Sequence, residues 1–154
     1  MDQPLQWREI YAIGHPRLDT DHRLLIDAIN AVCAACKQEC EPSELQKLLD
    51  VLQEITKEHF ENENVVLREI ISKTGQPSAV VKAISKAVLR DHIDEHERLL
   101  AHLQSIICAS SLDTSSARTR LCEELRAWFI DHAIKSDADL KSAFQIMQGT
   151  SLLS

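Results

Sequence analysis

Hydrophobic residues recur every three or four positions along most of the chain, which is the period of an amphipathic helix. This pattern predicts four helices, over residues 19–37, 43–72, 78–107 and 116–147. Turn-forming and serine-rich segments separate them. Long helices joined by short loops favour an all-α fold, an antiparallel up-down-up-down four-helix bundle.

The residues before the first helix have no such period, and we predict an irregular N-terminal arm there. Three of its apolar side chains are available to pack on the bundle, namely Trp7, Tyr11 and Ile13. We therefore expect one domain over residues 1–154, made of an arm (1–17), a bundle (18–147) and a tail (148–154).

Seven histidines and carboxylates occupy positions on the predicted inner stripes that apolar residues would otherwise fill. They are His22, His59, Glu63, His92, His96, His132 and Asp137. Burying one unpaired imidazole or carboxylate costs on the order of 1–3 kcal/mol, so each of them needs a partner. A metal site inside the bundle satisfies all of them together, because imidazole nitrogens and carboxylate oxygens are ligands of transition metals.

The spacing of these residues favours two metal ions over one. His59 with Glu63, and His92 with His96, stand four residues apart and so share one helix face. Any one histidine alone is more often an ordinary core or surface residue, but their joint placement on four helices favours a metal site. Seven ligands exceed the needs of one ion, whereas two bridging carboxylates leave five histidines for terminal positions and at least one position open.

The step from His132 to Asp137 is five residues. On an ideal helix, five residues turn about 140° past a full revolution, so both side chains can face the core only if the helix is locally loosened. We therefore predict a π-type bulge between them.

Composition and charge narrow the function classes. The net charge of -7 and the pI near 5.4 show no excess of basic residues, which binding to nucleic acid or anionic membranes would require. No apolar stretch is long enough to span a membrane, and the N-terminus lacks the features of a signal peptide. A cytoplasmic protein is expected.

Five cysteines in a chain with no export signal indicate reduced thiols. Cys33 and Cys36 form a CxxC inside a helical pattern, which we interpret as small apolar packing residues; a redox or sensing thiol pair is the alternative. The two remaining histidines, His15 and His102, lack the stripe alignment, and we interpret both as solvated.

The motifs that carry these residues resemble those of the hemerythrins and bacteriohemerythrins. The segment IGHPRLDTDH, which ends in His22, is similar to the first-helix signature of that family. His59-Phe60-Glu61-Asn62-Glu63 resembles its HFxxE motif, and His92-Ile93-Asp94-Glu95-His96 resembles its HxxEH motif. Trp128 through His132 to Asp137 resembles its WxxxHxxxxD motif. The chain departs from the family after the second-helix ligands, where Asn64, Val65 and Val66 replace a Glu- and Met-bearing segment.

The resemblance implies a hemerythrin-like HHE domain with two non-haem iron ions joined by an oxo or hydroxo bridge. It implies that His92, His96 and His132 hold one iron, that His22 and His59 hold the other, and that Glu63 and Asp137 bridge them. Dioxygen would be the ligand of the iron that has two histidines. Trp128 corresponds to a pocket-wall position in the family, although a simple core role is the alternative.

The leading hypothesis is therefore reversible dioxygen binding without enzymatic activity. The protein would be an oxygen carrier, or the oxygen- or redox-sensing part of a signalling protein whose output domain could be a cyclic-dinucleotide synthase. Two alternatives use the same ligands: a di-iron peroxidase or oxidase, and a zinc or manganese module without redox function.

Overall fold

The computed structural model of the 154-residue chain describes residues 4–72, 79–109, 111–136, 138 and 141. In chain order its helices are η1 (Glu9–Tyr11), α1 (Pro16–Lys37), α2 (Pro42–Ser72), α3 (Ala79–Ala109), α4 (Ser115–Asp131) and η2 (His132–Ser136). No strand is present among these residues, and the predicted all-α fold class is confirmed.

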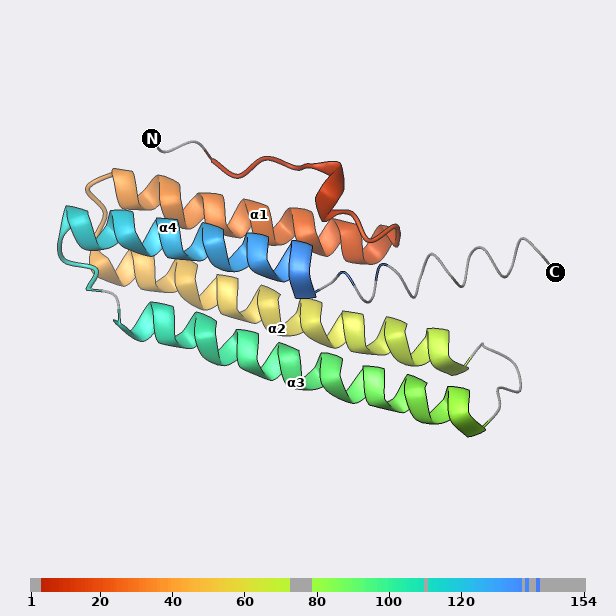
Figure 1. The fold of residues 1–154 in the computed structure, drawn as a ribbon. Coiled ribbons are helices and arrows are strands. Elements are labelled where there is room, and N and C mark those ends of the chain that lie inside the picture. The colour runs from red at the N-terminus through yellow and green to blue at the C-terminus, as the bar shows by residue number, and fades with distance from the viewer. Residues whose placement is uncertain (1–3, 73–78, 110, 137, 139–140, 142–154) are drawn as a thin grey trace.

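The four long helices lie side by side, and successive helices run in opposite directions along the bundle (Figure 1). α1 packs against α2 and α4, and α3 packs against α2 and α4. Within the described part of the chain, no helix combines the length and the hydrophobicity that a membrane span requires. The metal-ligating candidates therefore lie on helices that surround one shared interior.

The predicted inner stripes of α1, α3 and α4 are buried wherever their side chains are described. On α2 the pattern predicts an inner stripe of Leu48, Leu52, Ile55, His59, Glu63, Val66 and Ile70. Leu52, His59, Glu63 and Val66 are buried as predicted, whereas Leu48 and Ile55 are half-buried and Leu49, outside the stripe, is fully buried. Because α2 packs against both α1 and α3, its buried face is wider than one stripe and includes Leu49. Thr56 is also fully buried there, and its hydroxyl donates a hydrogen bond to the carbonyl of Leu52 at 2.7 Å.

The helix that contains His132 changes to a more loosely wound form at this residue, as predicted. α4 ends at Asp131 and continues as η2, a π-helix of five residues that begins at His132. The prediction of a π-type bulge after His132 is confirmed. Asp137 and most of the predicted helix beyond it lie outside the described residues.

The N-terminal arm packs on the bundle as predicted. Tyr11 and Ile13 are each 3% exposed, and Trp7 is half-buried beneath the guanidinium of Arg23, which lies 4.4 Å from its ring centroid. The arm turns into α1 at Gly14, whose positive φ of 95° suits a residue without a Cβ.

Two side chains of α1 hold this arm in place. The amide of Asn30 both accepts a hydrogen bond from the backbone N–H of Leu5 and donates one to its carbonyl, each at 2.9 Å. The carboxylate of Asp19 accepts from the backbone N–H of Ile13 at 2.7 Å and from that of Gly14 at 3.3 Å. The arm is thus fixed at Leu5 and again at Ile13 and Gly14.

Replacing Asn30 by alanine removes both hydrogen bonds to Leu5. We expect the free energy of unfolding to fall by about 1–2 kcal/mol, since two net hydrogen bonds are lost. We also expect the amide of Leu5 to exchange with deuterium faster. Asp27→Ala, an exposed position on the same helix, is the matched control. Unchanged exchange at Leu5 in the Asn30 variant would contradict the role of this contact.

Candidate metal centre

Six of the seven predicted ligands come together inside the bundle, one or two from each of the helices around it. They are His22 on α1, His59 and Glu63 on α2, His92 and His96 on α3, and His132 at the start of η2. None of these side chains is more than 6% exposed. The seventh, Asp137, lies outside the described residues.

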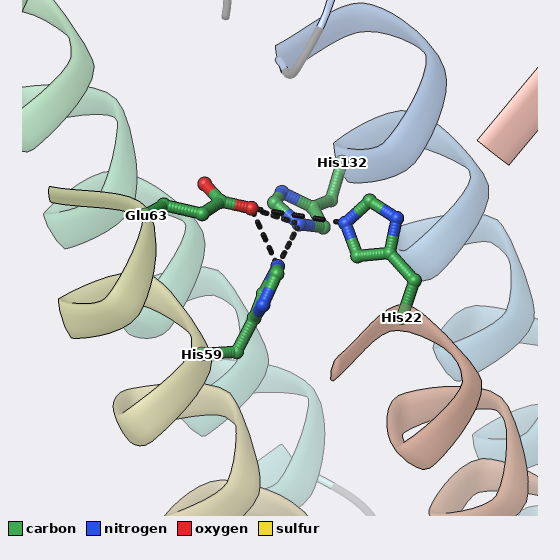
Figure 2. A group of neighbouring side chains, drawn as sticks. All are labelled: His22, His59, Glu63 and His132. Carbon is green, nitrogen blue, oxygen red and sulfur yellow. Dashed lines mark hydrogen bonds and ion pairs between the residues drawn. The ribbon is translucent and has the colours of Figure 1, made fainter. Parts of the chain in front are cut away.

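One oxygen of the Glu63 carboxylate faces three histidines from three different helical segments (Figure 2). Its Oε1 lies 2.5 Å from Nε2 of His59, 3.5 Å from Nε2 of His132 and 3.7 Å from Nε2 of His22. One ligand atom from each of these four residues lies within 4.8 Å of the others, which is close enough to hold one ion.

The other oxygen of the same carboxylate faces α3. Oε2 of Glu63 lies 2.7 Å from Nε2 of His96 and 3.2 Å from Nε2 of His92. These three residues form a second group with the spacing of a metal site. Glu63 therefore stands between two groups of histidines, which is the position of a bridging carboxylate.

The structure places His132 on the Oε1 side of this bridge. Its Nε2 lies 3.1 Å from Nε2 of His59, in the group that contains His22. The sharing of one iron by His132, His92 and His96 was implied by the family resemblance, and it stays a prediction.

In their neutral forms, His22 and His59 carry the ring proton on Nδ1 and direct the Nε2 lone pair toward the centre. Nδ1 of His22 lies 2.8 Å from the backbone carbonyl of Tyr11, which can only accept, so a neutral His22 carries its proton there. Nδ1 of His59 lies 3.2 Å from the carboxylate of Asp21. This carboxylate also can only accept, so a neutral His59 carries its proton on Nδ1 as well. The Nε2 lone pairs of both rings then point toward the carboxylate of Glu63, an arrangement that a cation between them would stabilise.

The pKa shifts of Glu63 and His59 also show that positive charge is favoured inside this cluster. Burial alone would favour neutral Glu63, but His59, His132 and His22 outweigh it and hold its pKa well below the usual value. Burial also disfavours charged His59, yet Glu63 and Asp21 raise the pKa of that imidazole to about 9. Either a proton on His59 or a metal ion supplies the positive charge that the Glu63 carboxylate requires. Nitrogen and oxygen donors of this kind bind borderline transition metals.

The net pKa shift of His96 is opposite to that of His59. Burial disfavours the charged ring and lowers the pKa of His96, despite the nearby carboxylate of Glu63. A neutral imidazole is the form that binds a metal, so this ring is held in its ligating state.

A chain of polar side chains outside the cluster orients His59. The carboxylate that faces its Nδ1, on Asp21, also accepts from Nδ2 of Asn62 at 3.0 Å. Oδ1 of Asn62 in turn accepts from the guanidinium of Arg17 at 2.8 Å. Burial raises the pKa of Asp21, but its hydrogen bonds with His59 and Asn62 outweigh this and lower it.

Sequence reasoning missed the role of Asp21 and Asn62. Both stand beside predicted ligands in the chain, since Asp21 precedes His22 and Asn62 precedes Glu63. Their contact, however, joins α1 to α2, and only the relative rotation of the two helices reveals it.

Aromatic rings cover the cluster. Phe60 stacks on His96 with a centroid distance of 4.2 Å and an angle of 5° between the planes. Trp128 lies parallel to His132 at 6.2 Å, and its indole N–H donates to the backbone carbonyl of Leu99 at 3.0 Å. Trp128 is thus both a core residue and a neighbour of the cluster, so the two roles predicted for it are compatible.

The two histidines interpreted as solvated differ in the structure. His102 is exposed, as predicted. His15 is half-buried, which corrects the prediction, because it occupies the N-cap position of α1 where the arm folds back on the helix.

Replacing Asp21 by alanine removes the carboxylate that fixes the ring of His59. Loss of such an outer partner typically weakens metal affinity about 10- to 100-fold, and we expect an effect in that range. Chelator competition measures it, with Asp27→Ala on the exposed side of α1 as the control. Equal affinities in the wild type and the Asp21 variant would contradict the orienting role.

Comparison with known proteins agrees with this geometry. Residues 14–144 match the family model of the hemerythrin HHE cation-binding domain. No curated protein and no solved structure gives a significant match. The matched range contains the whole buried cluster, and together they indicate metal binding. The chain belongs to the hemerythrin HHE cation-binding domain family.

Proposed function

We propose that this protein binds dioxygen reversibly at two non-haem iron ions inside the bundle. The observation that supports the proposal best is the donor set, in which five buried imidazoles surround the carboxylate of Glu63. Asp137, five residues after His132 in the sequence, is the proposed second bridging carboxylate.

The balance between imidazoles and carboxylates favours binding over oxidation chemistry. Di-iron enzymes of the carboxylate type use several glutamates with Glu-x-x-His motifs, and these anionic ligands stabilise high oxidation states. Neutral imidazoles stabilise high oxidation states less than carboxylates do. We accordingly propose a binding protein and not an enzyme.

Two ferrous ions, when bound, supply the electrons that dioxygen takes up and returns on release. The chain contributes the orientation of the ligands and the exclusion of water. The carbonyl of Tyr11 and the carboxylate of Asp21 each hold a ring proton on the outer nitrogen of a histidine, which directs the inner nitrogen to the centre. Phe60 and Trp128 cover the imidazoles that they stack on and so help to exclude water from them.

A carrier and a sensor use the same centre, so the donor set supports both. A carrier needs only the bundle. A sensor needs in addition an output domain, for which a cyclic-dinucleotide synthase is one chemical possibility.

Anaerobic reduction followed by exposure to air tests the proposal. We expect a visible charge-transfer band that appears with air, disappears on degassing and returns over repeated cycles. Direct conversion to an oxidised form that degassing does not reverse would contradict reversible binding. Sustained consumption of hydrogen peroxide with an added reductant would favour the peroxidase, and a protein that holds zinc after growth in iron-rich medium would favour the non-redox module.

Replacing Glu63 by alanine tests the bridge. We expect the iron content to fall by at least one ion per chain, because both groups of histidines share this carboxylate. Elemental analysis measures it. Glu58→Ala, an exposed position on the same helix, should leave the content unchanged. Full iron occupancy in the Glu63 variant is the result that the bridging assignment does not allow.

A further inference from the structure

A second group of chemically reactive side chains lies at the other end of the bundle, where α1 ends and α4 begins. Cys33 and Cys36 on α1 and Cys122 on α4 line one pocket of about 260 Å³. Cys33 and Cys122 are 4% and 6% exposed, while Cys36 is half-buried. None of the three takes part in a disulfide. The CxxC of the sequence thus meets a third cysteine, distant in the chain.

Arg118 holds the two helix ends together around this pocket. It stands one turn before Cys122 on α4, and its guanidinium donates to the carbonyl of Cys40 at 2.8 Å and to that of Gln38 at 3.3 Å. Both acceptors follow the end of α1. The thiols of Cys36 and Cys122 are therefore held on facing helices in a fixed register.

The three thiols differ in character. A hydrogen bond with Cys122 lowers the pKa of Cys36 against the effect of burial, and the nearby charge of Arg118 also lowers it. Hydrogen bonds with Cys33 and Cys36 raise the pKa of Cys122. Cys36 is therefore the most accessible of the three, and its thiolate is stabilised whereas that of Cys122 is not, which are the properties of a reactive cysteine.

Cationic groups line the same pocket. Lys37 and Arg126 both contribute to its wall. Nε of Arg126 is buried and has no hydrogen-bond partner among the described residues. Positive charge beside a thiol favours the thiolate and any anion released from it.

Helix geometry selects the disulfide partner of Cys36. Residues three apart on a helix have Cβ atoms roughly 5–6 Å apart, whereas a disulfide needs about 3.5–4.5 Å. Cys33 and Cys36 therefore cannot join without distorting α1. Cys122 approaches from the neighbouring helix and is free of this restriction.

We propose that Cys36 and Cys122 form a peroxide-reactive thiol site that closes into a disulfide between α1 and α4. The Cys36 thiolate attacks hydrogen peroxide, the O–O bond breaks, and the products are a sulfenic acid and hydroxide. The sulfur of Cys122 then displaces the sulfenic oxygen, which leaves as water with the thiol proton and one from solvent or the sulfenic group. In total, two thiols and one peroxide give one disulfide and two waters. The site does not depend on the proposed dioxygen binding.

Peptide mapping of the full chain with its own metal tests this proposal. The protein is reduced, freed of reductant and treated with a small excess of hydrogen peroxide, which catalase then removes. Free thiols are blocked, and the protein is digested without reductant. We expect peptides joined through Cys36 and Cys122 from monomeric protein, lighter by two hydrogens and separable by dithiothreitol.

Two variants assign the reactive sulfur. Cys36→Ser should abolish the crosslink, while Cys33→Ala, the matched control one turn earlier, should retain it; circular dichroism confirms that both fold. In Cys122→Ser, dimedone should label Cys36, since the sulfenic acid has no partner.

Several results would overturn the proposal. A disulfide that contains Cys33, or oxidation confined to the exposed Cys108, would show that the reactive pair is assigned wrongly. A Cys36–Cys122 crosslink with diamide but none with peroxide would show that the thiols are close but do not react with peroxide.

Discussion

A fully buried carboxylate with imidazole nitrogens on both sides is the constraint on which the rest of the structure depends. Glu63 faces His59, His132 and His22 with one oxygen and the two histidines of α3 with the other. Its charge cannot be left uncompensated in this interior. The requirement for a cation there fixes the register of four helices, since each must bring a ligand to the same level of the bundle.

The surroundings of the cluster follow from the same constraint. The arm supplies the carbonyl that holds the proton of His22, so the fastening of the arm by Asn30 also bears on the orientation of a ligand. Asp21 does the same for His59 from α1. The π-helical segment His132–Ser136 lets the chain present His132 as a ligand and changes the helical rotation of the residues that directly follow it.

Much of this could be predicted because helical periodicity shows which residues face inward. The polar residues on the inner stripes, and the five-residue step after His132, needed nothing more than that. The pairing of Asp21 with His59 and the approach of Cys122 to Cys36 could not be predicted, because they depend on how one helix is rotated against another. The burial of Leu49 on α2, outside the predicted stripe, has the same origin, since that helix packs against two neighbours.

X-ray absorption at the iron edge of the anaerobically reduced protein tests the central claim most directly. The account predicts a first coordination shell rich in imidazole nitrogen, whose ring atoms give multiple scattering, and a second iron as a near neighbour. A single isolated iron, or a shell dominated by carboxylate and water oxygen, would contradict the assignment of five histidines around Glu63 to a shared di-iron centre.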